Sequence, residues 1–102
     1  MHELLNNNRA ALEGLCSRFG VARLEAFGSA LREDFKDGSS DLDFLVQFKS
    51  LEPYARVDAY FGLLDELRTM FQRGVDLVMA DAVRNPYISR EIDRTKQLLY
   101  AA

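Results

Sequence analysis

The sequence predicts an α/β fold (α+β in some schemes), built as a small mixed β-sheet with helices packed against it. Two observations favour this fold. Apolar residues recur at helical spacing in three stretches of the chain, and three short apolar runs have the length of β-strands. Strands and helices of this kind are expected to bury their apolar sides in one core. The 102 residues are expected to form a single domain, residues 1–102.

The first predicted helix covers residues 3–19. The residues at helical spacing in this stretch are Leu4, Leu5, Asn8, Leu12, Leu15, Cys16 and Phe19. Gly20 is well placed to end the helix. Because Cys16 belongs to the apolar side, we expect its thiol to be buried and unreactive.

Two strands and a long helix follow. Residues 22–27 alternate in part between polar and apolar types and predict the first strand, and residues 42–48 predict the second. The second run is too apolar to have an exposed face, so we expect it in the centre of the sheet, covered by helices. A helix over residues 54–72 is predicted next, with Pro53 in its first turn and Gly74 after its end. The residues expected to place this helix in the core are Val57, Tyr60, Phe61, Leu64, Leu67, Met70 and Phe71.

The last two predicted elements are a strand over residues 75–79 and a helix over residues 86–100. Pro86 lies near the start of this helix, where proline is tolerated. The apolar residues assigned to the helix are Ile88, Ile92, Leu98 and Leu99.

Two aspartates lie at the start of the second predicted strand, one just before it and one within it. In a strand, alternate side chains share a face, so Asp41 and Asp43 are expected to point the same way. Neighbouring carboxylates repel each other, and packing alone does not require them at the start of a strand. Mg²⁺ takes hard oxygen ligands and is usually held by one or two carboxylates plus substrate phosphates. The pair therefore indicates a divalent-cation site, with a solvated loop edge as the simpler alternative.

A glycine–serine turn ends the first strand. Gly28 lets the backbone approach a ligand closely, and Ser29 can cap a following turn while offering a hydroxyl. Backbone N–H groups at such a position form an anion site. Gly-Ser alone is also typical of an ordinary β-turn. Its combination with Ser-Asp-x-Asp, beginning eleven residues after the serine, favours a phosphate-binding and metal-binding site.

Asp76 stands out within the third predicted strand, because its four apolar neighbours suggest that it is buried. A buried carboxylate is costly unless it is paired or bound to a metal. The residues alone leave three interpretations open. Asp76 is a surface residue on an edge strand, the partner of an arginine, or a third metal ligand beside the other two aspartates.

The combination of motifs resembles the nucleotidyltransferase superfamily related to DNA polymerase beta, and within it the minimal, MNT-type branch. The pattern there is Gly-Ser, a short spacer, and then Asp-x-Asp. The residues that carry the pattern in this chain are Gly28, Ser29, Asp41 and Asp43, with Arg32 and Ser40 as weaker matches. The resemblance covers roughly residues 20–80 and implies a polymerase beta-like nucleotidyltransferase fold.

The resemblance also implies a chemistry, which is transfer of AMP from ATP to a hydroxyl. Asp41 and Asp43 would hold two Mg²⁺ ions, and Asp76 would complete the shell of the catalytic ion and help to deprotonate the acceptor. Gly28 and Ser29 would hold the β- and γ-phosphates. Nucleotide-binding roles are further assigned to Arg32 and Ser40, although an exposed helix arginine explains Arg32 equally well.

The minimal branch is commonly paired with a HEPN-domain protein in two-gene toxin–antitoxin modules. The resemblance therefore implies an antitoxin that adds AMP to a tyrosine of such a toxin. Two alternatives remain open. One is an antitoxin or subunit that masks its partner without turnover, and the other is an enzyme that modifies a small molecule, such as an antibiotic, as a dimer or with a helical partner.

Composition and charge exclude several other functions. The formal net charge of −3 argues against a direct grip on nucleic-acid phosphates, which needs clustered Lys and Arg. No apolar run approaches the ~20 residues of a membrane-spanning helix. One Cys and one His exclude an internal disulfide and a zinc site of the usual ligands. We expect a cytoplasmic protein with no membrane contact.

Overall fold

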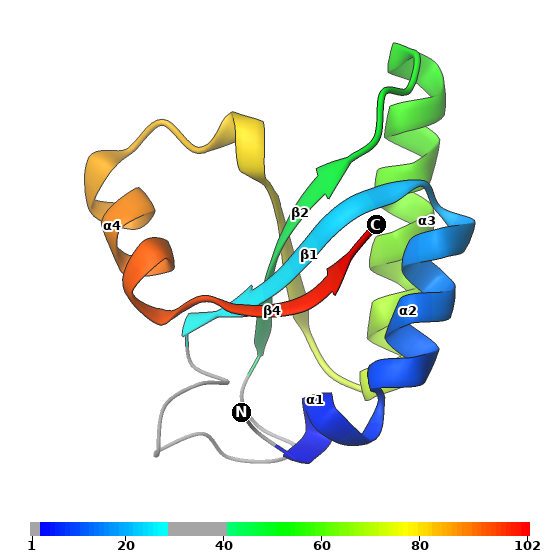
Figure 1. Ribbon diagram of the computed structural model, residues 1–102, viewed down its shortest axis with the longest axis horizontal. Helices are drawn as coiled ribbons and strands as arrows, with labels where there is room; N and C mark the ends of the chain where they lie inside the picture. Colours follow the sequence, from blue (N-terminus) through cyan, green and yellow to red (C-terminus); the bar gives the residue numbers. More distant parts are fainter. Residues whose placement is uncertain (1–2, 29–40) are drawn as a thin grey trace.

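The computed structural model describes residues 3–28 and 41–102 of the chain. In chain order, the elements are α1 (Glu3–Asn7), α2 (Arg9–Arg18), β1 (Val21–Phe27), β2 (Leu42–Phe48), α3 (Pro53–Phe71), β3 (Val75–Met79), the 3-10 turn η2 (Ala80–Ala82), α4 (Pro86–Thr95) and β4 (Gln97–Ala101). The predicted α/β fold with a mixed sheet flanked by helices is confirmed (Figure 1). None of the helices in this described part of the chain is long and apolar enough to cross a membrane.

The four strands form one sheet in the order β3-β2-β1-β4. β1 is antiparallel to both of its neighbours, whereas β2 and β3 are parallel. A parallel pair needs a long crossover, and α3 supplies it between the two strands. β2 is an inner strand, as its apolar sequence predicts, and β3 and β4 are at the two edges.

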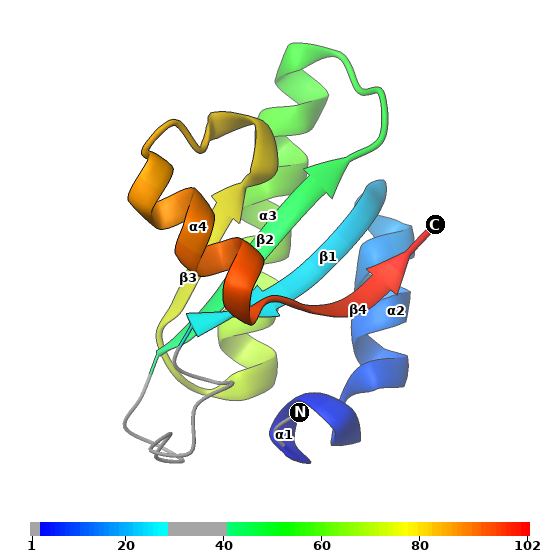
Figure 2. The same cartoon turned by 60° about the vertical axis from the view of Figure 1, so that its left-hand side comes forward.

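Helices cover the two faces of the sheet unequally. α2 and α3 lie side by side on one face, and α4 lies on the other (Figures 1 and 2). The main core lies under α2 and α3, where the rings of Phe44 and Phe71 stack with their centroids 5.9 Å apart. Leu45 and Ile92 are buried on the α4 side. Cys16 is fully buried in the main core, as predicted, and burial raises the pKa of its thiol to about 12.

The predicted helix over residues 3–19 is wrong in one respect, because it is two helices that meet at Asn8. The Asn8 side chain donates a hydrogen bond from Nδ2 to the Leu4 carbonyl at 2.8 Å. The Asn8 backbone N–H turns instead to the Leu5 carbonyl, at 3.3 Å. Asparagine side chains compete in this way with the backbone bonds of a helix. The break therefore has a local cause that apolar spacing does not reveal.

The set of α3 residues predicted to lie in the core is partly wrong. Leu64, Leu67 and Phe71 are buried, as is Leu63, which was not in the predicted set. Val57 and Phe61, however, are 51% and 58% exposed. A helix on the surface of a sheet buries only the side that faces it, and these two residues lie outside that side.

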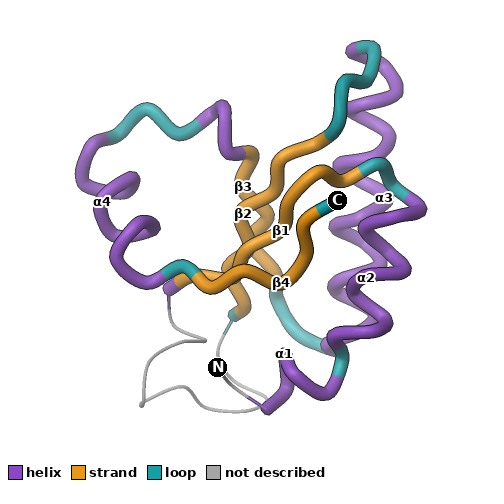
Figure 3. Tube along the Cα trace, viewed as in Figure 1, coloured by secondary structure: helices purple, strands orange, loops and turns teal. Residues whose placement is uncertain are grey.

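The largest error concerns the end of the chain, where a helix over residues 86–100 was predicted. α4 ends at Thr95, and Lys96, with ψ of 142°, leaves the helical conformation. Figure 3 shows the change from helix to strand at this point. β4 pairs with the edge of β1 that β2 leaves free, and Leu99 is buried while Leu98 is exposed. Pairing with a distant strand overrides the local helical pattern.

Candidate active site

Two of the three predicted acids lie next to each other across neighbouring strands. Asp43 of β2 and Asp76 of β3 are Cα partners in the parallel register. Paired residues of a sheet place their side chains on the same face, and both aspartates line one pocket of about 410 Å³. The fold therefore brings together residues that are far apart in sequence.

Asp76 is exposed, so the expectation that it is buried is wrong. β3 is an edge strand, and its alternate residues Val75, Leu77 and Met79 face the core under α3. Asp76 points to the opposite face, where the start of the strand is open to solvent. Its four apolar neighbours in sequence therefore do not surround it in space.

Each of the other two carboxylates lies against a glycine. A Cβ added to Gly28 would lie 2.5 Å from Asp43 Oδ2, and a Cβ added to Gly74 would overlap Asp41 Oδ1. Gly28 follows β1 directly and Gly74 precedes β3, so the two glycines flank the beginning of β2. The lack of side chains at these two positions leaves room for the two carboxylates.

Asp41 and Asp43 are directed toward these two different glycines. Over residues 3–28 and 41–102, no three acids, histidines or cysteines are grouped closely enough to hold a metal ion. The roles of Asp41, Asp43 and Asp76 as metal ligands remain predictions.

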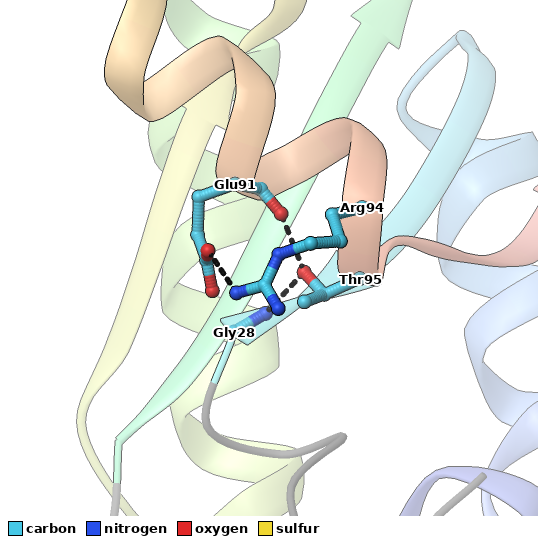
Figure 4. A network of polar contacts seen from close by, with 4 residues as sticks. All are labelled: Gly28, Glu91, Arg94 and Thr95. Atoms are coloured by element: carbon cyan, nitrogen blue, oxygen red, sulfur yellow. Dashed lines mark hydrogen bonds and ion pairs between the residues drawn. The ribbon is translucent and has the colours of Figure 1, made fainter.

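Gly28 has a left-handed backbone, with φ of +73°. This conformation is easily reached by glycine and rarely by other residues. Its N–H donates a hydrogen bond to Thr95 Oγ1 at 3.2 Å, and the Thr95 hydroxyl donates in turn to the Glu91 carbonyl at 2.9 Å (Figure 4). The end of α4 therefore holds the turn at which the predicted phosphate-binding segment begins. The other predicted nucleotide-binding residues, Ser29, Arg32 and Ser40, lie outside the described residues.

The pocket that contains Asp43 and Asp76 has a mostly apolar wall. The other residues that line it are Phe27, Tyr60, Leu64, Arg68, Val75, Leu77, Val78 and Ile88. Tyr60 donates its hydroxyl proton to the Leu77 carbonyl at 2.6 Å, which fixes one wall against β3. Ile88 is 50% exposed, and the guanidinium-bearing Arg68 also belongs to the wall.

Sequence reasoning missed several residues of this region. Tyr60 was assigned only to the core, and Arg68 carries no local signal on the polar side of a long helix. Gly74 was interpreted only as a helix terminator, although a glycine before a strand can also mark a close approach of another group. Thr95 was hidden within the helix that was predicted to run on to residue 100.

Comparison with known proteins agrees with this geometry. Residues 9–99 match the family model described as the nucleotidyltransferase domain. The chain is 34% identical over 86 residues to a protein named "Putative protein adenylyltransferase MJ0128" from Methanocaldococcus jannaschii, a match that covers 84% of this chain and 82% of the relative.

Two solved structures extend the comparison. One is described as a "putative minimal nucleotidyltransferase" and superposes with a TM-score of 0.66 at 27% identity, covering 95% of both chains. The other contains the tri-AMPylated HEPN toxin of Shewanella oneidensis in complex with MNT antitoxin, and superposes with a TM-score of 0.59. At 18% identity, over 96% of this chain and 73% of that chain, this second likeness shows the fold.

By class, then, the protein is an α/β nucleotidyltransferase with acids from adjacent strands at one pocket. The chain belongs to the nucleotidyltransferase domain family, and its predicted resemblance to the minimal branch is confirmed. The prediction that it is an enzyme of this type is likewise confirmed.

Proposed function

We propose that this nucleotidyltransferase transfers AMP from ATP to a hydroxyl of a partner protein, specifically a tyrosine of a HEPN-type toxin, and so acts as an antitoxin in the cytoplasm. The observation that carries the proposal is the pairing of Asp43 with Asp76 at a pocket beside the Gly28 turn. The names of the similar proteins support AMP as the transferred group and a HEPN toxin as the acceptor.

The donor set fits magnesium. Asp41, Asp43 and Asp76 offer only carboxylate oxygens, which Mg²⁺ prefers. The space beside Gly28 and Gly74 accommodates the first two carboxylates without a clash. We propose that Asp41 and Asp43 hold two ions and that Asp76 contributes to one of them. Bound Mg²⁺ would neutralise phosphate charge and stabilise the attacking and leaving oxygens of an in-line displacement.

The residues of the chain have separate tasks in the proposed transfer. The acceptor oxygen forms a bond to the α-phosphorus, the bond from that phosphorus to the bridging oxygen breaks, and pyrophosphate leaves. The hydroxyl proton passes to the Asp76 carboxylate, which is exposed and therefore accessible to an incoming acceptor. Gly28, whose N–H is bonded to Thr95, would let the backbone approach the β- and γ-phosphates closely, and Ser29, Arg32 and Ser40 would supply the polar groups that bind the nucleotide.

The pocket along β3 is the proposed entrance for the acceptor side chain. It contains Asp76, and its apolar wall includes Leu64 and Ile88, which suits an aromatic ring better than a charged or strongly hydrated group. Two further large apolar side chains, Phe61 and Tyr87, are 58% and 78% exposed on the neighbouring helices α3 and α4. A docked protein would cover them and position its hydroxyl for attack.

The test is transfer from α-labelled ATP to a co-purified partner, followed by mass spectrometry of both proteins. We expect the partner to gain mass in units of AMP on a tyrosine when Mg²⁺ is present, and Asp43→Asn to prevent this. Binding of the partner without label transfer would replace the proposal by a masking, binding-only antitoxin. Efficient labelling of free aminoglycosides or nucleotides with an unlabelled partner would replace it by a small-molecule enzyme.

A further inference from the structure

Thr95 links the last turn of α4 to the Gly28 turn of the candidate active site. Its hydroxyl accepts the hydrogen bond of the Gly28 N–H at 3.2 Å and donates its own proton to the Glu91 carbonyl at 2.9 Å. Figure 4 shows the two bonds meeting at the hydroxyl oxygen. Gly28 and Thr95 are 67 residues apart in sequence, so this contact exists only in the folded chain.

The direction of the two bonds is determined by the Thr95 side chain. A hydroxyl has one proton and two acceptor lone pairs. Because the proton is committed to Glu91, a lone pair is left for the Gly28 N–H. A backbone N–H can only donate, so Gly28 needs an acceptor at this point. Thr95 supplies that acceptor in a fixed direction.

The position of Thr95 is itself held from both sides. On the helix side, the Lys96 N–H donates to the Ile92 carbonyl at 2.8 Å. On the strand side, Gln97 is the Cα partner of Ala26 in β1. The Lys96 ammonium also lies 3.2 Å from Asp93 and 4.0 Å from the buried Glu25 of β1. These contacts give Thr95 little freedom to move relative to the end of β1.

Gly28 is confined on its other side by the acid of β2. The position of a Cβ at Gly28 lies 2.5 Å from Asp43 Oδ2, so the carboxylate packs against the Gly28 backbone. Thr95 at the amide and Asp43 at the α-carbon together determine where the turn lies. A change at Thr95 therefore alters the placement of the turn relative to Asp43.

From this arrangement we infer that Thr95 is a positioning residue for nucleotide binding. It holds the Gly28 backbone in place beside the Asp43 carboxylate, which is a proposed magnesium ligand of the nucleotide site. The inference rests on the proposed function, since it assigns the turn to a nucleotide triphosphate. Thr95 itself bonds to Gly28 and Glu91 and acts on the nucleotide through the turn.

The test compares Thr95→Val, Thr95→Ala and Thr95→Ser. Valine keeps the branched shape without the hydroxyl, alanine removes both, and serine keeps the hydroxyl. We expect valine and alanine to raise the dissociation constant and the KM for Mg²⁺-ATP by about three- to tenfold, the equivalent of one hydrogen bond, with a smaller change in kcat. Serine should remain within about twofold of the wild type by the same reasoning.

Two further readouts separate positioning from a purely structural role. Hydrogen exchange at the Gly28 amide should accelerate in the valine and alanine variants and not in the serine variant. Alanine has a higher helix propensity than threonine, which offsets part of the stability lost with the hydrogen bond, so Thr95→Ala should still fold while binding ATP more weakly. It also serves as the test if Thr95→Val does not fold.

The outcomes are distinct. If the wild-type chain binds no ATP, the proposed function is wrong and the inference fails with it. If the wild type binds ATP and the valine and alanine variants bind it equally well, only the inference about Thr95 is wrong. Equal weakening in all three variants, serine included, would also contradict a role for the hydroxyl.

Discussion

Asp43 and Asp76 are Cα partners on the only parallel strand pair, β2 and β3, among the strands of the described chain. The pairing puts two carboxylates on one face of the sheet although the 19 residues of α3 and the loops on either side of it separate them in sequence. Like charges in such a position repel, so their arrangement adds little to folding and is better explained by a cation and a phosphate.

Replacing each aspartate by asparagine should separate chemistry from folding. Asp41→Asn, Asp43→Asn and Asp76→Asn should each abolish AMP transfer, because an amide is a weaker metal ligand and cannot accept the proton. Asp76 is exposed, so its variant should change the free energy of unfolding by no more than about 0.5 kcal/mol. Urea melts and label transfer are measured side by side. A loss of several kcal/mol in Asp76→Asn would instead identify the partner of a structural ion pair.

Binding of ATP should depend on the metal. With Mg²⁺ present, ATP at a hundred times its dissociation constant should stabilise the folded chain by about 2.7 kcal/mol, which a thermal melt detects readily. With a chelator, no cation would bridge the phosphates and the aspartates, and the shift should be much smaller. Asp43→Asn provides the matched variant, in which the two shifts should become similar. Equal shifts in the wild type would contradict a metal bridge between the acids and the nucleotide.

The two glycines should be intolerant of alanine, and a third glycine of the chain provides the control. Gly28→Ala places a methyl group against Asp43 in a left-handed conformation, and Gly74→Ala displaces the Asp41 carboxylate. Both should weaken Mg²⁺-ATP binding, and Gly28→Ala should also destabilise the fold by more than about 1 kcal/mol. Gly14 in α2 has open space around its Cβ position, so Gly14→Ala should stabilise by about 0.5–1 kcal/mol. Wild-type ATP affinity in Gly74→Ala would show that the position of Asp41 does not matter.

A charge at the rim of the pocket should prevent binding of the acceptor side chain and leave ATP binding unchanged. Ile88 lines the pocket and is 50% exposed, so Ile88→Asp should fold while repelling an apolar ring. Transfer to the partner should fall at least tenfold, with the ATP-induced thermal shift unchanged. Leu98 on β4 is 42% exposed and lies outside the pocket, which makes Leu98→Asp the control. Equal transfer by the two variants would place the acceptor elsewhere.

The buried thiol should make stability depend on pH in the alkaline range. Burial raises the pKa of Cys16 from 9.0 to about 12, with a smaller contribution from Glu13. The unfolded chain therefore loses the thiol proton first, and the stabilisation present below about pH 9 is lost as the pH rises toward about 12. The free energy of unfolding should fall by about 1.4 kcal/mol per pH unit in that range. Cys16→Ala should flatten this slope, and native Cys16 should resist alkylation at pH 8 until the chain is unfolded.

The sequence alone predicted those strands whose own residues indicate both their length and their place in the sheet. The run from Leu42 to Phe48 is mostly apolar, and it forms an inner strand with the predicted bounds. Val75–Met79 is likewise the predicted third strand. The candidate acids could be identified for the same reason, because Asp41, Asp43 and Asp76 are the charged residues that interrupt or begin these apolar runs. Their residue types and spacing also sufficed for the family.

The tertiary structure alone decided the features that depend on a distant partner. Residues 97–101 have no strong local preference for a strand, and they form one because the free edge of β1 offers backbone hydrogen bonds. Asp76 is exposed because β3 lies at the edge of the sheet, which its apolar neighbours in sequence cannot reveal. Thr95 contacts Gly28 because the pairing of β4 with β1 places the end of α4 beside the end of β1. Apolar periodicity reports which side of an element is buried, whereas contacts between residues 67 apart arise from strand order and register, which the local pattern does not encode.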